Sequence, residues 1–71
     1  MYRMAYEVLY SRHARERMVL RGISRDEVEV AIQAGSKTRQ GSKVVAAHRY
    51  FEVVYVVRGT KILVITVKPR W

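Results

Sequence analysis

The chain has 71 residues, enough for one small domain and too few for a second hydrophobic core. It contains no cysteine, so neither a disulfide nor a thiolate zinc site can strengthen that core. Hydrophobic residues make up 49% of the sequence, too many for a disordered tail, and no apolar run approaches the roughly 18 residues that a membrane span requires. Since the first residues also lack the pattern of a secretion signal, we expect a single domain over residues 1–71, located in the cytoplasm and not in a membrane.

The net charge is strongly positive. Fourteen lysines and arginines stand against six acidic residues, which gives a formal charge of +8, and ten of the fourteen are arginines. Guanidinium groups bind phosphate through paired N–H donors, so this surplus favours a nucleic-acid partner, and RNA is the partner we expect. The alternatives are a charge that serves solubility and the ion-pair-rich surface of a thermophilic protein.

A strand followed by two helices is predicted for the first half of the chain. Residues 2–10 alternate with a period of two, so Tyr2, Met4, Tyr6, Val8 and Tyr10 share one face of a strand. Ser11 is a good N-cap for the first helix, and Gly22 suits the left-handed residue that ends it. The second helix begins with a capping box and ends at a glycine, and its residues are Ser24, Glu27 and Gly35. The buried helix faces are expected to contain Ala14, Met18, Val28, Ala31 and Ile32.

Three strands are predicted for the second half, at 43–49, 51–57 and 62–67, and the polar segment before them leaves room for a short strand at 37–40. Gly59 suits the first central position of a two-residue type II′ hairpin. That turn would pair Val57 with Ile62, Tyr55 with Val64, and Val53 with Thr66. The predicted fold is therefore α+β with the order β-α-α-β-β-β, in which a helical hairpin packs on one face of a small antiparallel sheet.

Both faces of the last two strands are apolar, although two helices can cover only one of them. We expect the helices to cover Val54, Val56, Leu63, Ile65 and Val67. The second face would then remain exposed as an apolar patch, and we expect it to form the interface of a homodimer or to bind a small antitoxin-like partner. This predicted interface contains Phe51, Val53, Tyr55, Ile62 and Val64.

Four segments together resemble a known prokaryotic family. They are "HARERM" at 13–18, "RGIS" at 21–24, the acidic "DEVEVAI" at 26–32, and "VVYVVRGTKILVITVKP" at 53–69. The chain resembles the family catalogued as domain of unknown function 4258 over nearly its whole length. The layout of that family is similar to the RelE- and BrnT-type ribonuclease toxins, in which a helical hairpin backs a small antiparallel sheet. The resemblance implies that the open sheet face and the last strand present basic and polar residues to RNA, and that an antitoxin covers part of the molecule.

RNA cleavage without a metal needs a base, an acid and cations that hold the phosphate. The segment "AHRYFE" supplies all these types in His48, Arg49, Tyr50 and Glu52, and strand pairing would bring Lys68 and Arg70 near them. This set, with Lys68, is our candidate catalytic site; the alternative is a polar strand end or turn. Neither a metal site nor a cofactor is expected, because the two histidines and the acidic residues lack ligand spacing.

The first helix carries the candidate phosphate contacts. We expect Arg12, His13 and Arg15 to contact nucleic acid together with Arg70, although a histidine at a helix start more often packs or caps. Arg17 and Arg21 flank the buried face, so we expect them to serve the fold. Tyr50, Phe51 and Tyr55 have the ring type that stacks on bases, and burial in a core or interface is the alternative for them.

The leading functional hypothesis is a small RNA-directed protein of the toxin-like kind, with metal-independent endoribonuclease as its candidate activity. A second hypothesis is a non-catalytic basic module that binds nucleic acid or a protein. A third is a structural homo-oligomer whose charge serves solubility.

Overall fold

The computed structural model describes residues 6–70, within which the chain forms two helices and five strands. In chain order these are β1 (Glu7–Tyr10), α1 (Arg12–Arg21), α2 (Arg25–Ala34), β2 (Ser36–Gln40), β3 (Lys43–His48), β4 (Phe51–Arg58) and β5 (Lys61–Pro69). The α+β fold and the order of its elements are confirmed, and the short strand anticipated before β3 is present as β2. The predicted N-terminal strand is confirmed only from Glu7 onward, since Tyr2 and Met4 lie outside the described residues.

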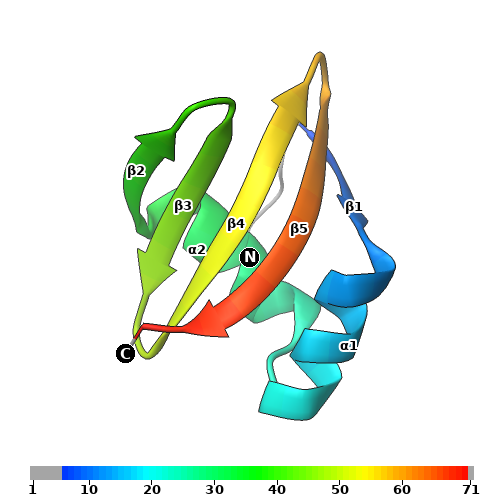
Figure 1. The fold of residues 1–71 in the computed structure, drawn as a ribbon, viewed down its shortest axis with the longest axis vertical. Coiled ribbons are helices and arrows are strands. Elements are labelled where there is room, and N and C mark those ends of the chain that lie inside the picture. The colour runs from blue at the N-terminus through cyan, green and yellow to red at the C-terminus, as the bar shows by residue number, and fades with distance from the viewer. Residues whose placement is uncertain (1–5, 71) are drawn as a thin grey trace.

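The strands form one mixed sheet in the order β1-β5-β4-β3-β2. Strands β2 to β5 are antiparallel neighbours, whereas β1 lies at the edge beside β5 and runs parallel to it (Figure 1). Two-residue hairpin turns fix the antiparallel direction of β2 to β5, but β1 leads into a helix, so no turn fixes its direction. The expectation of a purely antiparallel sheet is therefore wrong for this edge.

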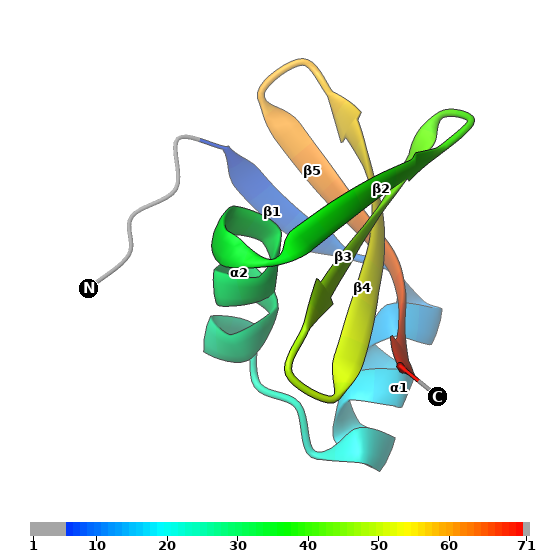
Figure 2. The ribbon, with the colours of Figure 1, turned by 90° about the vertical axis from the view of Figure 1, so that its left-hand side faces the viewer.

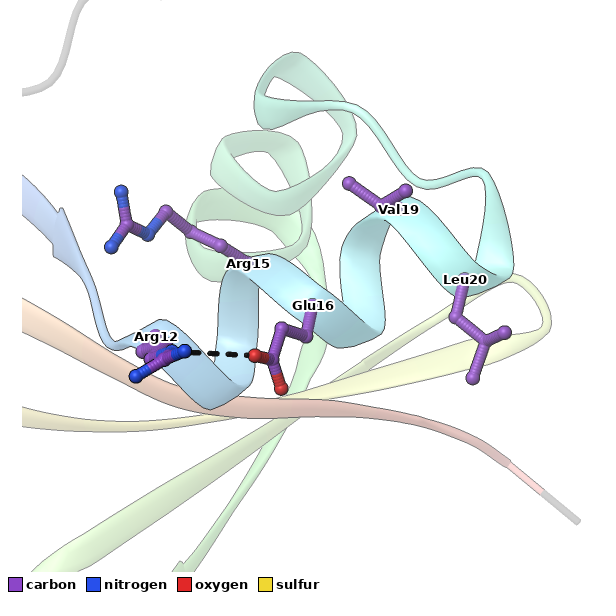
Figure 3. A pocket seen from close by; sticks show the side chains of 5 residues that line it. All are labelled: Arg12, Arg15, Glu16, Val19 and Leu20. Atoms are coloured by element: carbon purple, nitrogen blue, oxygen red, sulfur yellow. Dashed lines mark ion pairs between the residues drawn. The ribbon is translucent and has the colours of Figure 1, made fainter.

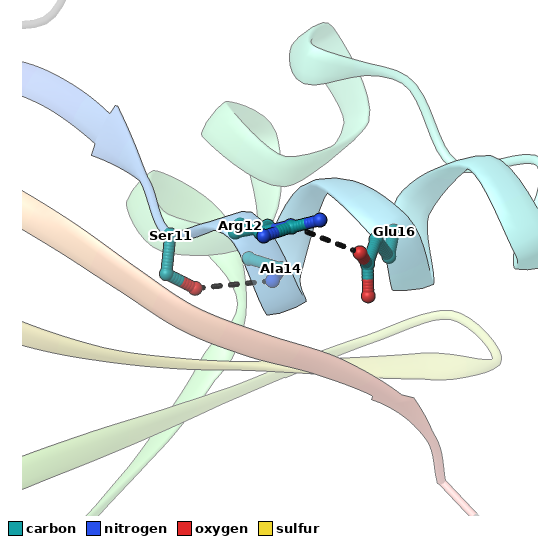
Figure 4. A network of polar contacts seen from close by, with 4 residues as sticks. All are labelled: Ser11, Arg12, Ala14 and Glu16. Atoms are coloured by element: carbon teal, nitrogen blue, oxygen red, sulfur yellow. Dashed lines mark hydrogen bonds and ion pairs between the residues drawn. The ribbon is translucent and has the colours of Figure 1, made fainter.

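The caps of both helices follow the local sequence signals. The Ser11 hydroxyl accepts a hydrogen bond from the Ala14 N–H at 3.0 Å and donates one to the Ile65 carbonyl at 2.8 Å, which fixes the start of α1 against β5 (Figure 4). Gly22 ends this helix with a φ of 68°. Ser24 and Glu27 form the expected capping box at the start of α2. All these caps are confirmed.

Three two-residue turns connect β2 to β5. The register places Gly41–Ser42, Arg49–Tyr50 and Gly59–Thr60 at the tips of the hairpins. The first central residue has a positive φ in every turn, at 65°, 56° and 61° respectively. Since among the described non-glycine residues only Arg49 has a positive φ, the turns match the type II′ pattern, as expected for Gly59.

The register of β4 and β5 departs from the expected one at a single residue. Val57 pairs with Ile62 and Tyr55 with Val64, as predicted. Beyond this point Ile65 is an extra residue in β5, so Val53 pairs with Val67 and not with Thr66. This bulge reverses the alternation of β5 and turns the Val67 side chain into the core.

The helices cover the sheet face opposite to the expected one. Both helices pack against the same side of the sheet, α1 on β5 and α2 on β3 and β4 (Figures 1 and 2). The sheet residues of the core include all five that were expected to form an open interface, namely Phe51, Val53, Tyr55, Ile62 and Val64. This face carries the two aromatic side chains of β4, so covering it removes more apolar area from water.

The opposite face has no helix over it. Along β3 and β4 it presents Val45, Val54 and Val56, which are nevertheless buried among their neighbours. At its β1–β5 side Leu9 and Leu63 are partly exposed. Val8 and Tyr10 of β1 pack against the core on the helix side, as their alternation predicted.

Candidate nucleic-acid interface

The β3–β4 turn holds an arginine in a conformation that usually requires glycine. Arg49 occupies the first central position with a φ of 56°, where the other two hairpins have Gly41 and Gly59. A side chain at positive φ costs about 1–2 kcal/mol, because its Cβ lies too close to the following carbonyl oxygen. The backbone of Arg49 is therefore strained, and its exposed side chain places a guanidinium group at the tip of this hairpin.

The end of β5 ties this turn down. The Arg70 side chain donates a hydrogen bond from Nη1 to the Arg49 carbonyl at 3.0 Å, and its backbone N–H donates one to the Tyr50 carbonyl at 3.1 Å. The sequence had predicted that Arg70 comes near this segment, and these bonds confirm it. Both turn carbonyls thus have donors from one residue, which stabilises the strained turn.

Two rings pack against Phe51 at the same end of the sheet. The Tyr50 and His48 rings each meet the Phe51 ring edge to face, with centroids 5.5 Å and 6.0 Å away. Phe51 is buried in the core, whereas 44% of Tyr50 remains exposed. Of the three aromatic residues considered for base stacking, only Tyr50 is available, because Tyr55 and Phe51 are core residues. Burial raises the pKa of Tyr55, and Arg39 acts in the opposite direction.

The end of α1 joins the turn in a shared hollow. Its lining contains Tyr50, Phe51 and Pro69 from the sheet, with Leu20, Arg21 and Ile23 from the helix and the loop after it. We name the group formed by Arg21, His48, Arg49, Tyr50 and Arg70 the turn-end cluster. None of its three guanidinium groups has an ion pair within residues 6–70. Sequence reasoning missed Arg21, which was assigned to the fold, because only tertiary packing brings the end of α1 to this turn.

The candidate catalytic set is divided between the two faces of the sheet. His48 lies on the helix side, where its ring contacts Phe51. Glu52 follows Phe51 in β4 and so points to the opposite face, where its carboxylate lies 3.8 Å from the Lys68 Nζ. The structure therefore brings Glu52 to Lys68, and His48 to Arg49 and Tyr50, but it does not unite the two groups on one face.

The three candidate contacts at the start of α1 are all exposed and lie far from the turn-end cluster. Nine residues of helix separate Arg12 from Arg21, which corresponds to about 13 Å along the axis. Arg12 was expected to contact nucleic acid, but its Nε lies 3.4 Å from the Glu16 carboxylate (Figure 4). Since both side chains are largely exposed, this pair contributes little to stability. Arg15 and His13 have no ion pair among the described residues.

The two helices carry opposite charge. Helix α1 has four arginines and one glutamate, whereas α2 has three acidic residues in its first half and one arginine. A polyanion would be repelled from the outer side of α2 and attracted to α1 and to the turn-end cluster. The basic surface of the molecule therefore lies on α1 and the turn-end cluster, and α2 forms an acidic surface.

Two further classes of site find no support in the part of the chain that the structure describes. Residues 6–70 contain no group of three or more His, Cys, Asp or Glu side chains placed to hold a metal ion. Neither described helix has the length and apolar character needed to cross a bilayer.

Comparison with known proteins gives a family and a fold. No curated protein matches the sequence. Among solved structures, a chain of the toxin–antitoxin complex RelBE2 from Mycobacterium tuberculosis is similar in fold, with a TM-score of 0.63 and 16% sequence identity over 94% of this chain and 100% of that chain. The family model of the domain of unknown function DUF4258 matches residues 10–68. The chain therefore belongs to the DUF4258 family.

Proposed function

We propose that this protein is a small RNA-binding protein of the toxin-like kind, and that RNA binds at the turn-end cluster. The observation that carries the proposal is the strained Arg49 at the tip of the β3–β4 hairpin. Strained residues persist where the surrounding structure holds them for a function, and the other two hairpins of the same chain avoid the strain with glycine. The fold similarity to a chain of a toxin–antitoxin complex supports the toxin-like assignment.

The cluster has the groups that single-stranded RNA requires. Tyr50 offers an exposed ring beside a hollow, and a base stacked on such a ring contributes about 1–3 kcal/mol. Arg21 lines the same hollow as Tyr50, Arg49 precedes Tyr50 in the turn, and the Arg70 side chain binds the Arg49 carbonyl, so the cluster has three guanidinium groups of the kind that binds phosphate oxygens. We therefore expect a preference for single-stranded RNA over duplex, because a base must leave its stack to reach Tyr50.

Binding should depend on salt to a degree set by these three arginines. Each phosphate contact contributes about 0.7 to the slope of log affinity against log salt on a single strand, so wild type should show a slope near −2. We expect Arg70→Ala to weaken binding and to reduce the slope by about 0.7. Fluorescence anisotropy with a labelled single-stranded RNA at several salt concentrations measures both values.

The matched control for this experiment is Arg15→Ala, which removes one exposed arginine from the start of α1 and leaves the cluster intact. Its slope and affinity should stay close to those of wild type. Equal losses from Arg15→Ala and Arg70→Ala would mean that charge alone drives binding and that the turn-end cluster is not the site. A flat salt response would leave only the solubility role of the charge.

Arg49→Gly separates function from stability. Glycine relieves about 1–2 kcal/mol of backbone strain, and its extra freedom in the unfolded chain takes back about 0.5–1 kcal/mol. The free energy of unfolding should therefore stay the same or rise by up to about 1.5 kcal/mol, while RNA affinity falls. Urea denaturation and the anisotropy assay test the two halves, and a variant that loses stability while retaining affinity would contradict the functional role of this residue.

Cleavage of RNA without a metal is the second candidate function, and one observation favours it. His48 places an imidazole at the turn-end cluster, next to Arg49 in the chain and against the same ring as Tyr50. One group that acts as acid or base and a phosphate-binding arginine are two of the three groups that metal-independent cleavage needs. Binding without cleavage would instead identify the non-catalytic basic module.

A further inference from the structure

The outer face of α1 is apolar at one end, although nothing in the described chain covers it. Val19 is 84% exposed and Leu20 is 68% exposed, more than any other large hydrophobic side chain of residues 6–70. They line a hollow together with Arg12, Arg15 and Glu16 (Figure 3). We name these five residues the α1 outer face.

The fold does not need these two side chains. Helix α1 buries Ala14 and Met18 against the sheet, and at 3.6 residues per turn the α1 outer face lies on the opposite side of the helix. Figure 3 shows Val19 directed away from the sheet, whereas Leu20 extends toward the end of the sheet, where it also lines the hollow beside Tyr50. Neighbouring exposed aliphatic side chains that are rimmed by charged residues are typical of a surface that contacts another molecule.

The apolar surface continues toward α2. A second hollow shares Arg15 and Val19 with the first and extends over Met18 and Ile23 to Arg25 at the start of α2. Arg25 itself lies over the Tyr10 ring, 5.6 Å from its centroid. The result is an apolar strip whose exposed part is Val19 and Leu20, while the buried Met18 and Ile23 line the rest of it and arginines lie along its border.

We infer that this strip is the docking site for an acidic amphipathic helix of a protein partner. The apolar side of such a helix would cover Val19 and Leu20, and its carboxylates would meet Arg15 and Arg25, since Arg12 is already paired with Glu16. Aliphatic side chains favour protein over RNA here, because they offer no ring on which a base stacks. The net charge of +8 opposes a second copy of the chain and favours an acidic partner.

Peptides selected from a displayed library of random helices test this inference without knowledge of the natural partner. Selection on the intact chain should enrich sequences that combine Leu or Ile at helical spacing with Asp or Glu beside them. Each enriched peptide should bind the double variant V19S/L20S about tenfold or more weakly, since two central apolar contacts are lost. Arg15→Glu should weaken binding similarly, because it places a negative charge against the carboxylates of the peptide.

Two matched controls separate this site from general stickiness. Val57→Ser removes an exposed valine at the far end of β4, and Arg58→Glu reverses an exposed charge beside it, and neither should change peptide affinity. All four variants should unfold at nearly the wild-type urea concentration, because the altered side chains are exposed or partly exposed.

Four results would overturn the inference. Peptides that bind V19S/L20S as well as wild type, or an enrichment without acidic residues, would show that the strip is not the site. Methyl signals of Val19 and Leu20 that shift in NMR spectra on addition of single-stranded RNA would assign the strip to RNA instead. Sedimentation of wild type as a dimer and of V19S/L20S as a monomer would assign it to a second copy. The inference does not depend on the turn-end cluster, so RNA binding can fail while peptide binding succeeds.

Discussion

Replacing Gly35 with alanine should destabilise the protein by about 3 kcal/mol, the upper part of the range for an inserted atom in a packed region. Gly35 follows α2, and its Cα lies where the helix end meets β3. An added Cβ would collide with the Ala31 carbonyl oxygen and would lie 2.8 Å from the Ala47 carbonyl oxygen. Both obstacles are backbone atoms held by the helix and the sheet, so neither can move without disturbing an element. A domain of this length is stable by about 4–10 kcal/mol, so the loss is a large fraction of the whole.

Urea denaturation measures this loss as a lower midpoint with an unchanged slope. Gly41→Ala is the matched control, because an added Cβ there meets no atom within 4 Å and only the positive φ of 65° opposes it. That variant should lose at most about 1.5 kcal/mol, because backbone strain of about 1–2 kcal/mol is offset by about 0.5–1 kcal/mol from the reduced freedom of the unfolded chain. If Gly35→Ala loses no more than Gly41→Ala, the close approach of α2 to β3 is not as the structure has it.

The helix caps and the hairpin turns were predictable because the interacting groups lie within a few residues of one another. Ser11 reaches the N–H of Ala14, and Ser24 exchanges hydrogen bonds with Glu27. Gly59 marks its turn because the required φ excludes most other residues. In all these cases the local sequence contains the groups that form the cap or turn, although Ser11 also makes a tertiary hydrogen bond to the Ile65 carbonyl.

The choice of the covered sheet face was not predictable from alternation. In β4 every residue from Val53 to Val57 is apolar, so a period of two distinguishes two faces without saying which one the helices cover. Strict alternation from Val64 would place Val67 on the face away from the helices. The bulge at Ile65 instead turns Val67 to the helix-covered face. Such a bulge carries no sequence signal here, since neither glycine nor proline accompanies it.

Four of the five residues of the turn-end cluster were predictable from the sequence, whereas Arg21 and the grouping of the site were not. The segment around His48 and the nearness of Arg70 were both recognised, but the tip of this hairpin lacks the Gly or Asn that marks a turn. Without that signal, the sequence did not predict that His48 pairs with Phe51 across the turn. This pairing puts His48 on the helix side and leaves Glu52 with Lys68 on the other face.

Substituting His48 by alanine should lower the rate of RNA cleavage by about 10²- to 10⁴-fold, the usual contribution of one general acid or base. Affinity for RNA should change little, because Arg21, Arg49, Arg70 and Tyr50 all remain. The lost edge contact with Phe51 should reduce the free energy of unfolding by only about 0.5–1.5 kcal/mol. A gel assay with labelled single-stranded RNA, run in the presence of EDTA, measures the rate and shows whether cleavage proceeds without a divalent metal.

Two control variants make this result specific to the turn-end cluster. His13→Ala removes the other histidine, which is exposed near the start of α1, and should leave the cleavage rate unchanged. Glu52→Gln tests the division between the faces: since Glu52 lies with Lys68 on the side away from His48, its rate should stay within about threefold of wild type, far from the loss expected of a general acid or base. A large loss from Glu52→Gln would mean that substrate reaches both faces around the sheet end. Cleavage that survives His48→Ala, or that stops with EDTA, would remove the catalytic role and leave the turn-end cluster as a binding site alone.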